Sequence, residues 1–487
     1  MGHDDLVLGF DIGTSAVKGA LYDMRGACIF ETTIAYQHKM PCPDWLEQDP
    51  EDWIRCMRDI AVQVGNSVGM QRLIGIGICS QVNTHVFVDE SGNPLRGAIV
   101  WQDQRCASVA EELRHRATQS AATANIPVDA SSLLSRAEWV CRFEPQVWKR
   151  TRWILSPKDY CILVLTGCPV TDPMTSIGLV NMEGEYIGEA IALVADLERR
   201  LPPIRPLAQY AGRTGVDWLP SEIPVAVGTM DAWASLFGSG TRAAGDAFQV
   251  AGTSEVIGIL SSRCEGVPGI VTFPRFNGLY LHAGPTQAGG DALKWFAQAI
   301  GRDMDNVLAL ATSPAAADEP LVFLPHLMGE RAPLWDSVAR GVFIGLSKRH
   351  KISDMALAVL RGVAMSARHL LEEVERSAAT GCTELRISGG ASRSDLWCQI
   401  KADVMNRTLR RVQNRDSGAF GAALLAREGV RRSAGIDDSN EAPIRIERTF
   451  EPDRDLAGFY QELYVAYRSA YEGLKPAFAT LARLRSA

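Results

Sequence analysis

The sequence lacks every pattern that would mark a metalloprotein, a secreted protein or a membrane protein. Its 11 cysteines include no Cys-x-x-Cys pair, and its 8 histidines form no His-Glu-x-x-His motif, so a zinc site or a disulfide framework is disfavoured. No apolar run reaches about 18 residues, and the opening residues MGHDDLVLGF lack a secretion signal. These absences predict a cytoplasmic protein with reduced thiols and no membrane partner.

Strong charge of either sign is also missing. The net charge is -7 over 487 residues, and the short cluster of Arg407, Arg410 and Arg411 predicts a solvated helix end rather than a nucleic-acid surface. No Gly-x4-Gly-Lys-Ser/Thr motif occurs, so a nucleotide site of the P-loop kind is excluded. The length predicts two or three domains, and we do not expect nucleic acid as a partner.

The stretch LGFDIGTSAVKGALYD near the start is the first informative feature. Alternating apolar residues on either side of a glycine predict two strands and a tight turn. In this first turn Gly13 leaves backbone amides uncovered, Thr14 and Ser15 add hydroxyl donors, and Lys18 adds a positive charge. Such a turn could bind an anion, with Asp11 sharing a cation with it. Taken alone, the stretch favours the alternative of an ordinary strand-joining turn.

An internal echo changes that balance. GTSAVKGAL, which begins at Gly13, recurs as GTSEVIGIL from Gly252, almost half the chain later. The copies differ at two informative positions, because Asp11 and Lys18 correspond to Val250 and Ile257. The echo predicts a duplicated domain, with halves at 1–245 and 246–487 that face each other across a cleft. Only the first half would carry a metal-linked acid.

Six blocks in order resemble the FGGY carbohydrate kinases, and within them the xylulokinases. They are GFDIGTSAVKGALYD, DWLEQDPEDW, AIVWQDQR, VAGTSEVIGIL, FLPHLMGERAPLWD and ISGGASRSDLWCQIKAD. The resemblance covers essentially the whole chain. It implies an α/β fold of two actin-like ATPase (ribonuclease H-like) domains, with ATP, Mg²⁺ and a sugar in the cleft between them.

The resemblance also implies the nucleotide-binding residues. Glycines that follow the strand LRIS would let a flat base approach the backbone, although an ordinary strand-to-helix turn explains them too. Lys294 is explained almost equally well as a solvated helix lysine. The residues implied to bind ATP are Gly13, Thr14, Ser15, Lys18, Thr253, Ser254, Gly290, Lys294, Gly389, Gly390, Ala391 and Ser394.

Asp231, in VGTMDAWASLFGSG, matches the catalytic base of the family. The stretch reads as an aspartate that opens a helix, so a helix cap is the structural alternative, and both roles are compatible. A carboxylate at a helix N-terminus is stabilised as an anion and can accept the proton of an attacking hydroxyl. By resemblance, Asp11 would hold Mg²⁺ through water, with Asp231 as a second metal-linked carboxylate.

The sugar pocket departs from the xylulokinase pattern. Asn83 stands where those proteins usually have His, and Ala232 stands where they usually have Asn, which puts xylulose itself in doubt. Arg361 replaces a usual Glu. The residues implied to contact the sugar are Gln81, Val82, Asn83, Trp101, Asp231 and Ala232, with Asp103 and Arg105 in the same block as Trp101.

The expected function is ATP-dependent phosphorylation of a small sugar, with a pentulose such as xylulose favoured. A kinase of another ketose or polyol, such as glycerol, a tetritol or ribulose, is the alternative within the family. The alternative from another class is an actin-like chaperone or assembly ATPase, which shares the phosphate hairpins but needs an extra substrate-binding domain. A homodimer is left open.

Overall fold

The structure, a computed structural model, divides into two compact units. The first contains residues 1–238 and 416–443, and the second contains residues 239–415 and 444–487. The chain therefore crosses between the units near residues 238, 416 and 443, whereas the echo suggested one crossing near residue 245. The residues described are 4–120, 123, 126–312, 319–414, 417–436 and 444–485.

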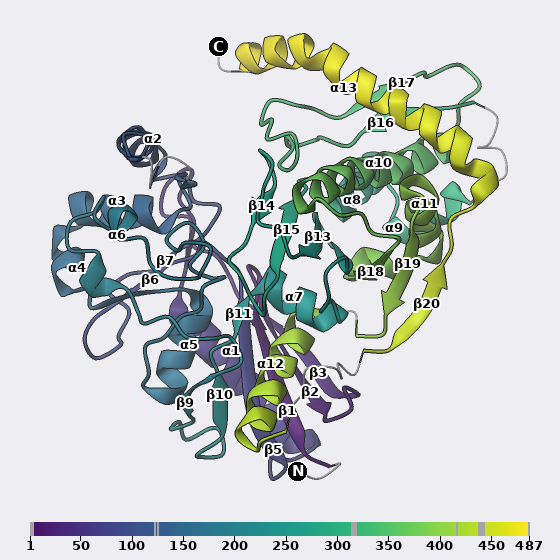
Figure 1. The fold of residues 1–487 in the computed structure, drawn as a ribbon. Helices are drawn as coiled ribbons and strands as arrows, with labels where there is room; N and C mark the ends of the chain where they lie inside the picture. Colours follow the sequence, from purple (N-terminus) through teal and green to yellow (C-terminus); the bar gives the residue numbers. More distant parts are fainter. Residues whose placement is uncertain are drawn as a thin grey trace. The chain divides into compact units, whose positions relative to one another are not determined.

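The first unit is built on a seven-stranded mixed sheet with the order β3-β2-β1-β5-β10-β9, and β11 also pairs with β5 (Figure 1). β1, β2 and β3 form an antiparallel meander, while β5 runs parallel to β1. The strands are β1 (Leu6–Ile12), β2 (Ala16–Asp23), β3 (Cys28–Ala35), β5 (Leu73–Ser80), β9 (Tyr210–Arg213), β10 (Pro224–Ala226) and β11 (Thr229–Met230).

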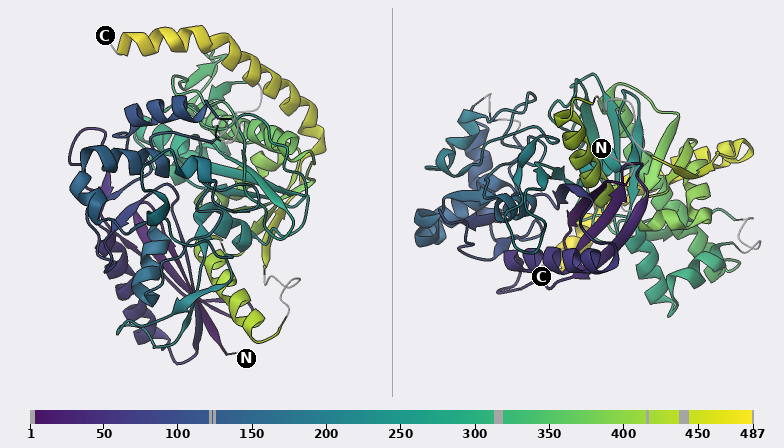
Figure 2. Two further views of the ribbon diagram at one scale, coloured as in Figure 1. Left: turned by 60° about the vertical axis from the view of Figure 1, so that its left-hand side comes forward. Right: turned by 90° about the horizontal axis from the view of Figure 1, so that it is seen from below.

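Helices cover both faces of this sheet, with α1 and α12 on opposite sides (Figure 2). A Cβ atom added to Gly77 would lie 1.8 Å from the Ala422 carbonyl oxygen, so α12 packs against β5 at glycine distance. On the other face Gly19 leaves room for Ile60 of α1. The helices are α1 (Pro50–Ser67), α2 (Ala107–Ala117), α3 (Leu133–Phe143), α4 (Pro145–Arg150), α5 (Pro157–Thr166), α6 (Gly188–Ile191), α7 (Asp231–Ser239) and α12 (Ser417–Ser433).

Two short strand pairs lie outside the main sheet of the first unit. β4 (Glu47–Gln48) pairs with β7 (Ala98–Ile99), and β6 (Val86–Val88) pairs with β8 (Trp153–Leu155). The buried core of the unit joins apolar residues of β1 and β5 to the inner face of α1, which begins with Asp49 as its cap and Pro50 at its first position.

The second unit is built on another seven-stranded mixed sheet, with the order β14-β15-β13-β12-β18-β19-β20. α10 and α11 pack against it (Figure 1). Its elements are β12 (Ala247–Ala251), β13 (Glu255–Ser261), β14 (Val271–Thr272), β15 (Tyr280–Pro285), α8 (Gly290–Ala299), α9 (Met304–Ala311), β16 (Val322–Leu324), β17 (Val342–Ile344), α10 (Ile352–Ala378), β18 (Glu384–Ser388), α11 (Asp395–Met405), β19 (Thr408–Val412), β20 (Ile446–Phe450) and α13 (Ala457–Arg485).

The sequence echo corresponds to a repeated topology. In the first unit the antiparallel pair β1 and β2 lies beside the parallel strand β5, and in the second the antiparallel pair β12 and β13 lies beside the parallel strand β18. The turn of each hairpin is closed by a backbone hydrogen bond, from Gly13 to Ala16 at 3.0 Å and from Gly252 to Ser254 at 2.9 Å. The predicted fold class of two α/β domains is confirmed.

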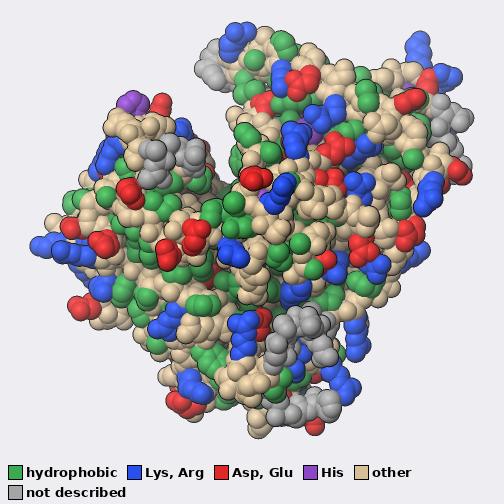
Figure 3. Space-filling view, viewed as in Figure 1, with side chains coloured by type: hydrophobic (Ala, Val, Ile, Leu, Met, Phe, Trp, Pro, Cys, Tyr) green, Lys and Arg blue, Asp and Glu red, His purple; other side chains and the backbone are tan. Residues whose placement is uncertain are grey.

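Acidic and basic side chains are interspersed over the face shown in Figure 3. Among the described residues, no helix is both long enough and apolar enough to cross a membrane.

Candidate active site

Three neighbouring strands of the first unit end together and bring the predicted residues to one edge. Ser80, the last residue of β5, pairs with Ile12 at the end of β1 and with Met230 at the end of β11, both in parallel register. The backbone N–H of Gln81 then donates to the Ile12 carbonyl at 3.0 Å. The first turn, Gln81 and Asp231 therefore lie side by side, because each directly follows one of these strands.

The first turn (Gly13–Ser15) is held from outside the hairpin. The Tyr36 hydroxyl donates to the Gly13 carbonyl, and the Tyr36 backbone N–H donates to the Ser15 carbonyl at 3.2 Å. The indole Nε1 of Trp101 donates to the Thr14 hydroxyl at 3.1 Å. A residue predicted for the sugar and one predicted for phosphate are thus in direct contact.

Asp11 pairs with Lys18 across the hairpin, one residue before the end of β1. Its side chain is almost fully buried, and a Cβ atom added to Gly418 would lie 2.7 Å from Asp11 Oδ2. The first turn of α12 therefore reaches the Asp11 carboxylate, and only glycine leaves it room. Sequence reasoning missed Gly418, because α12 follows Asp11 by about 400 residues.

These residues fit the mode in which Mg²⁺ binds to kinases. The described residues contain no group of three or more His, Cys, Asp or Glu side chains that could hold a metal without help. Mg²⁺ is usually held by one or two carboxylates together with water and substrate phosphates, so a closed protein cage is not required. Asp11, one residue before the end of β1, and Asp231, directly after β11, supply carboxylate oxygens of this kind beside the first turn.

Asp231 is the first residue of α7, as expected from its sequence. The backbone N–H of Ala232 donates to Asp231 Oδ1 at 2.7 Å, so the carboxylate does make a contact at the helix N-terminus. Burial raises the pKa of Asp231 to about 6, and this rise is partly opposed by the Ala232 N–H and by the positive charge of Lys18. A carboxylate with such a pKa is ionised at neutral pH yet holds a proton more readily than an exposed aspartate does.

The remaining sugar-pocket residues are anchored by their own unit. Asn83 adopts a left-handed backbone conformation, with φ of 56°, and its Nδ2 donates to Ser131 Oγ at 3.1 Å. Its carbonyl accepts a hydrogen bond of 2.7 Å from the fully buried guanidinium of Arg136. Val82 is partly buried between Gln81 and Asn83. The Asn83 amide is thereby committed to a protein partner.

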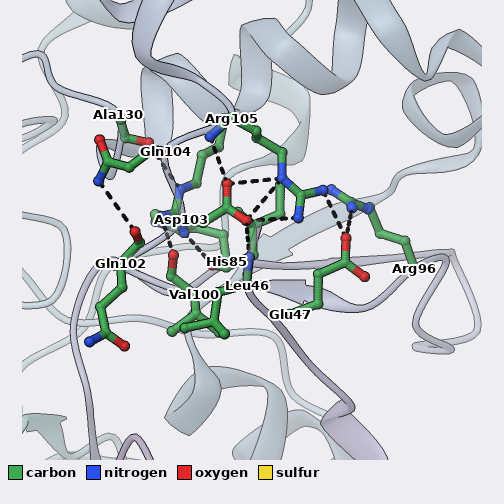
Figure 4. Close-up of polar contacts among 12 residues, drawn as sticks. Leu46, Glu47, His85, Arg96, Val100, Gln102, Asp103, Gln104, Arg105 and Ala130 are labelled. Carbon is green, nitrogen blue, oxygen red and sulfur yellow. Dashed lines mark hydrogen bonds and ion pairs between the residues drawn. The ribbon is translucent and has the colours of Figure 1, made fainter. Parts of the chain in front are cut away.

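Asp103 and Arg105 form a buried salt bridge (Figure 4). Arg105 Nη2 lies 2.7 Å from Asp103 Oδ2, and Arg105 Nη1 lies 2.8 Å from Glu47 Oε1. Arg96 binds the same Glu47 oxygen at 2.5 Å, and the Arg105 guanidinium stacks on Trp45 at 3.9 Å. Both side chains of the pair are fully excluded from solvent, so this is not a surface salt bridge.

A second buried charge cluster supports the strand that leads to Asp231, and sequence reasoning missed it. Lys158 Nζ lies 3.0 Å from Asp172 Oδ2 and also contacts Asp159. The same ammonium donates to the Val227 carbonyl at 3.2 Å, and the Thr229 hydroxyl donates to Asp172 Oδ1 at 3.0 Å. A charged pair in the apolar stretch SPKDYCILVLTG was the signal that could have found it, because buried charges need partners.

In the second unit three predicted segments converge on the second turn (Gly252–Ser254). The backbone N–H groups of Gly290 and Asp291, at the start of α8, donate to the carbonyls of Gly252 and Thr253 at 2.8 and 3.1 Å. A Cβ atom added to Gly389 would lie 2.4 Å from the Ala251 carbonyl oxygen. The glycines that precede α8 and α11 are therefore needed for close approach to the backbone around this turn.

A buried ion pair links the second turn to α11. Glu255, directly after the turn, accepts from Lys401 Nζ at one carboxylate oxygen and from Gln249 Nε2 at 2.8 Å at the other. Both charged side chains are 1 % exposed. α11 begins after Ser394, whose side chain accepts from the Trp397 N–H at 3.2 Å, as expected for a helix cap.

Two other positions have simpler explanations. Lys294 is exposed on α8, as expected for a solvated helix lysine. The Arg361 guanidinium lies 5.2 Å from the Phe459 ring centroid and 5.6 Å from that of Tyr460, so it packs against α13. A cavity of about 460 Å³ in the first unit, lined from α1, β8 and α5, contains none of the predicted residues.

Comparison with known proteins agrees with this arrangement. Residues 6–238 match the N-terminal domain, and residues 247–427 the C-terminal domain, of the FGGY family of carbohydrate kinases. The chain belongs to this family. The predicted resemblance is therefore confirmed, and the chain is a carbohydrate kinase.

Individual relatives span the chain almost completely. A xylulose kinase from Lactococcus lactis is 29% identical, with 96% of each chain covered. A glycerol kinase from Thermococcus gammatolerans is 28% identical, with 92% of this chain and 94% of the relative covered. The crystal structure of a xyloylose kinase from Brucella ovis is 30% identical, with a TM-score of 0.88, and the match covers 97% of this chain and all of that one.

Proposed function

We propose that the protein transfers the γ-phosphoryl group of ATP to a hydroxyl of a small ketose or polyol in the cytoplasm, with a pentulose such as xylulose as the favoured substrate class. The single observation that carries this proposal is the juxtaposition of Asp231 with Gln81 and the first turn at one sheet edge. It supports the proposal because a buried carboxylate, a buried amide and a turn with two hydroxyls meet within one unit. The xylulose kinases among the relatives support the pentulose, and the glycerol kinases support a polyol as the second candidate.

In this mechanism Asp231 accepts the proton of the attacking hydroxyl. Its pKa of about 6 leaves it ionised at neutral pH and basic enough to take up the proton as the oxygen attacks phosphorus. Amides and hydroxyls of the first and second turns would bind the phosphates. Asp11, with Asp231, would hold Mg²⁺, which when bound neutralises phosphate charge. Gly389, Gly390, Ala391 and Ser394 would bind adenosine.

A substrate screen tests the proposal. Purified protein with ATP and Mg²⁺ is assayed for ADP release against a panel of pentuloses, hexuloses and polyols that includes D-xylulose and glycerol. We expect sugar-dependent ADP release with at least one member of the panel, and a phosphorylated product by mass spectrometry. ATP hydrolysis that no sugar or polyol stimulates would contradict the proposal and favour an assembly or chaperone ATPase.

A further inference from the structure

Gln48, on β4, bridges the first turn and the sugar pocket. Its side chain is fully buried. Gln48 Nε2 donates to the Thr14 carbonyl at 2.7 Å, and Gln48 Oε1 accepts from Gln81 Nε2 at 2.7 Å. The sequence block DWLEQDPEDW contains this glutamine, and the proposed function gives it no role.

The polarity of this chain of hydrogen bonds is fixed at one end. The Thr14 carbonyl can only accept, so the Gln48 amide must present its nitrogen to Thr14 and its oxygen to Gln81. Gln81 must then present its own nitrogen to Gln48. If the Gln48 amide were flipped, its oxygen would face the Thr14 carbonyl oxygen. The Gln81 amide could be flipped only if the Gln48 amide were flipped too.

His38 supports the same orientation. Its Nδ1 lies 3.4 Å from Gln48 Nε2, and burial lowers the pKa of His38, so the ring is neutral at neutral pH. A neutral ring with its proton on Nε2 offers Nδ1 as an acceptor for the second N–H of Gln48. With this tautomer both hydrogens of the Gln48 amide nitrogen have acceptors.

The outcome is a defined acceptor at Gln81. Gln81 Oε1 is buried and has no hydrogen-bond partner among the residues that the structure describes. Gln81 is only 2% exposed, and its backbone N–H donates to the Ile12 carbonyl. Leaving a buried acceptor unsatisfied costs about 1–3 kcal/mol, so this oxygen is a site for a ligand donor.

We propose that Gln48 is a positioning residue that orients Gln81 so that Gln81 Oε1 accepts a hydrogen bond from a hydroxyl of the substrate. This inference rests on the proposed function for the identity of the ligand as a sugar or polyol. It adds a specificity rule, because a substrate must present a hydroxyl donor, rather than an ether or a fluorine, to Gln81. It also joins the sugar pocket to the phosphate turn through Thr14.

A double-mutant cycle measured by binding calorimetry without ATP tests the proposal. The probe is the tightest-binding member of the pentulose, hexulose and polyol panel. Gln81→Leu and Gln48→Met should each weaken sugar binding by about 5- to 150-fold, which is the cost of an unsatisfied buried donor or acceptor converted at tenfold per 1.4 kcal/mol. Because Gln48 acts through Gln81, the double variant should bind no more weakly than Gln81→Leu.

Two further variants separate positioning from a general loss of stability. Thr214→Val, in the same unit, removes a buried hydroxyl that donates to the Pro220 carbonyl at 2.6 Å, and it should leave sugar binding unchanged. Gln48→Glu can make both contacts only when its carboxyl is protonated. The ratio of its sugar affinity to that of wild type should therefore be higher at acidic than at neutral pH.

Three outcomes would overturn the proposal. They are additive losses of affinity in the cycle, a Gln48→Met variant that binds sugar as tightly as wild type, and no binding of any panel member. Failure of the proposed function has a different signature. If sugars bind and the cycle is non-additive but no phosphate is transferred, the kinase proposal fails while the role of Gln48 stands.

Discussion

The hydroxyl of Thr229 donates a hydrogen bond of 3.0 Å to Asp172 Oδ1. Thr229 lies two residues before Asp231 in the chain. Asp172 in turn is paired with Lys158, and both charged side chains are wholly excluded from solvent. The short strand that carries Asp231 is therefore attached to a buried charge pair. Such a pair is costly to dehydrate and strongly directional, so it fixes backbone position more than it adds stability.

Thr229→Val tests whether this attachment positions Asp231. Valine keeps the shape and removes the hydrogen bond, so kcat should fall by roughly 10- to 100-fold as the base shifts from the hydroxyl. The KM for ATP should stay near the wild-type value. Thr214→Val is the matched control, since it removes a buried threonine hydroxyl of the same unit that lies on a different strand connection. Equal kcat in the two variants would contradict a positioning role.

Asp231→Asn separates the base from the helix cap. Asparagine caps a helix about as well as aspartate but cannot take up the proton. If Asp231 is the base, sugar phosphorylation should fall by roughly 10²–10⁴-fold, while ATP affinity stays near wild type. Asp231→Ala also loses the cap and should cost about 0.5–2 kcal/mol of stability. Turnover, ATP affinity and melting temperature are measured for both, and near-normal kcat in Asp231→Asn would remove Asp231 from the mechanism.

The pH dependence of the reaction should report the same carboxyl. Burial raises the pKa of Asp231 from 3.8 to about 6, so kcat/KM should decline as the pH falls below about 6. Between these two values the folded protein binds more protons at this site than the unfolded chain does, so its contribution to stability declines as the pH rises. Asp231→Asn should therefore melt no lower than wild type at neutral pH. An acid limb that persists in the residual activity of Asp231→Asn would assign it to another group.

Local patterns predicted the turns and helix starts well. The glycine-centred hairpin from Gly13, its copy from Gly252, the helix start at Asp231 and the cap at Ser394 all follow from short-range rules on turns and caps. These rules act over a few residues, so the sequence states them directly.

Contacts between distant segments could not be predicted in the same way. Gln48 lies on β4 outside the main sheet and Gln81 follows β5 within it, and nothing in either local sequence shows that the two amides meet and are both buried. The position of α12 in the first unit depends on glycines of β1 and β5 that admit the helix backbone, among them Gly9 and Gly77. A glycine in a strand indicates close approach, but it does not name the partner.

The ion pair between Glu255 and Lys401 should behave as a buried pair. Lys401→Met leaves an uncompensated carboxylate beside the second turn and should cost about 3–5 kcal/mol of stability. The double variant Glu255→Leu with Lys401→Met removes both charges and should recover most of that loss. Melting temperature and nucleotide affinity are measured for wild type, single and double variants. A double variant no more stable than Lys401→Met would show that the pairing of charges is not what Lys401 contributes.

D-xylulose itself should not be the best substrate, although pentuloses are the favoured class and xylulose kinases are prominent among the relatives. Asn83 and Ala232 stand where xylulokinases usually carry His and Asn, and the Asn83 amide is committed to Ser131. A pocket without polar partners for a substrate hydroxyl disfavours that substrate by up to about 10²-fold. Another ketose or polyol should therefore show the higher kcat/KM in the substrate panel.

Ala232→Asn and Asn83→His, made singly and together, should raise kcat/KM for D-xylulose relative to the kcat/KM for the best wild-type substrate. Thr214→Val should leave this ratio unchanged. If wild-type protein prefers D-xylulose over every other panel member, these two departures do not determine the specificity of the pocket.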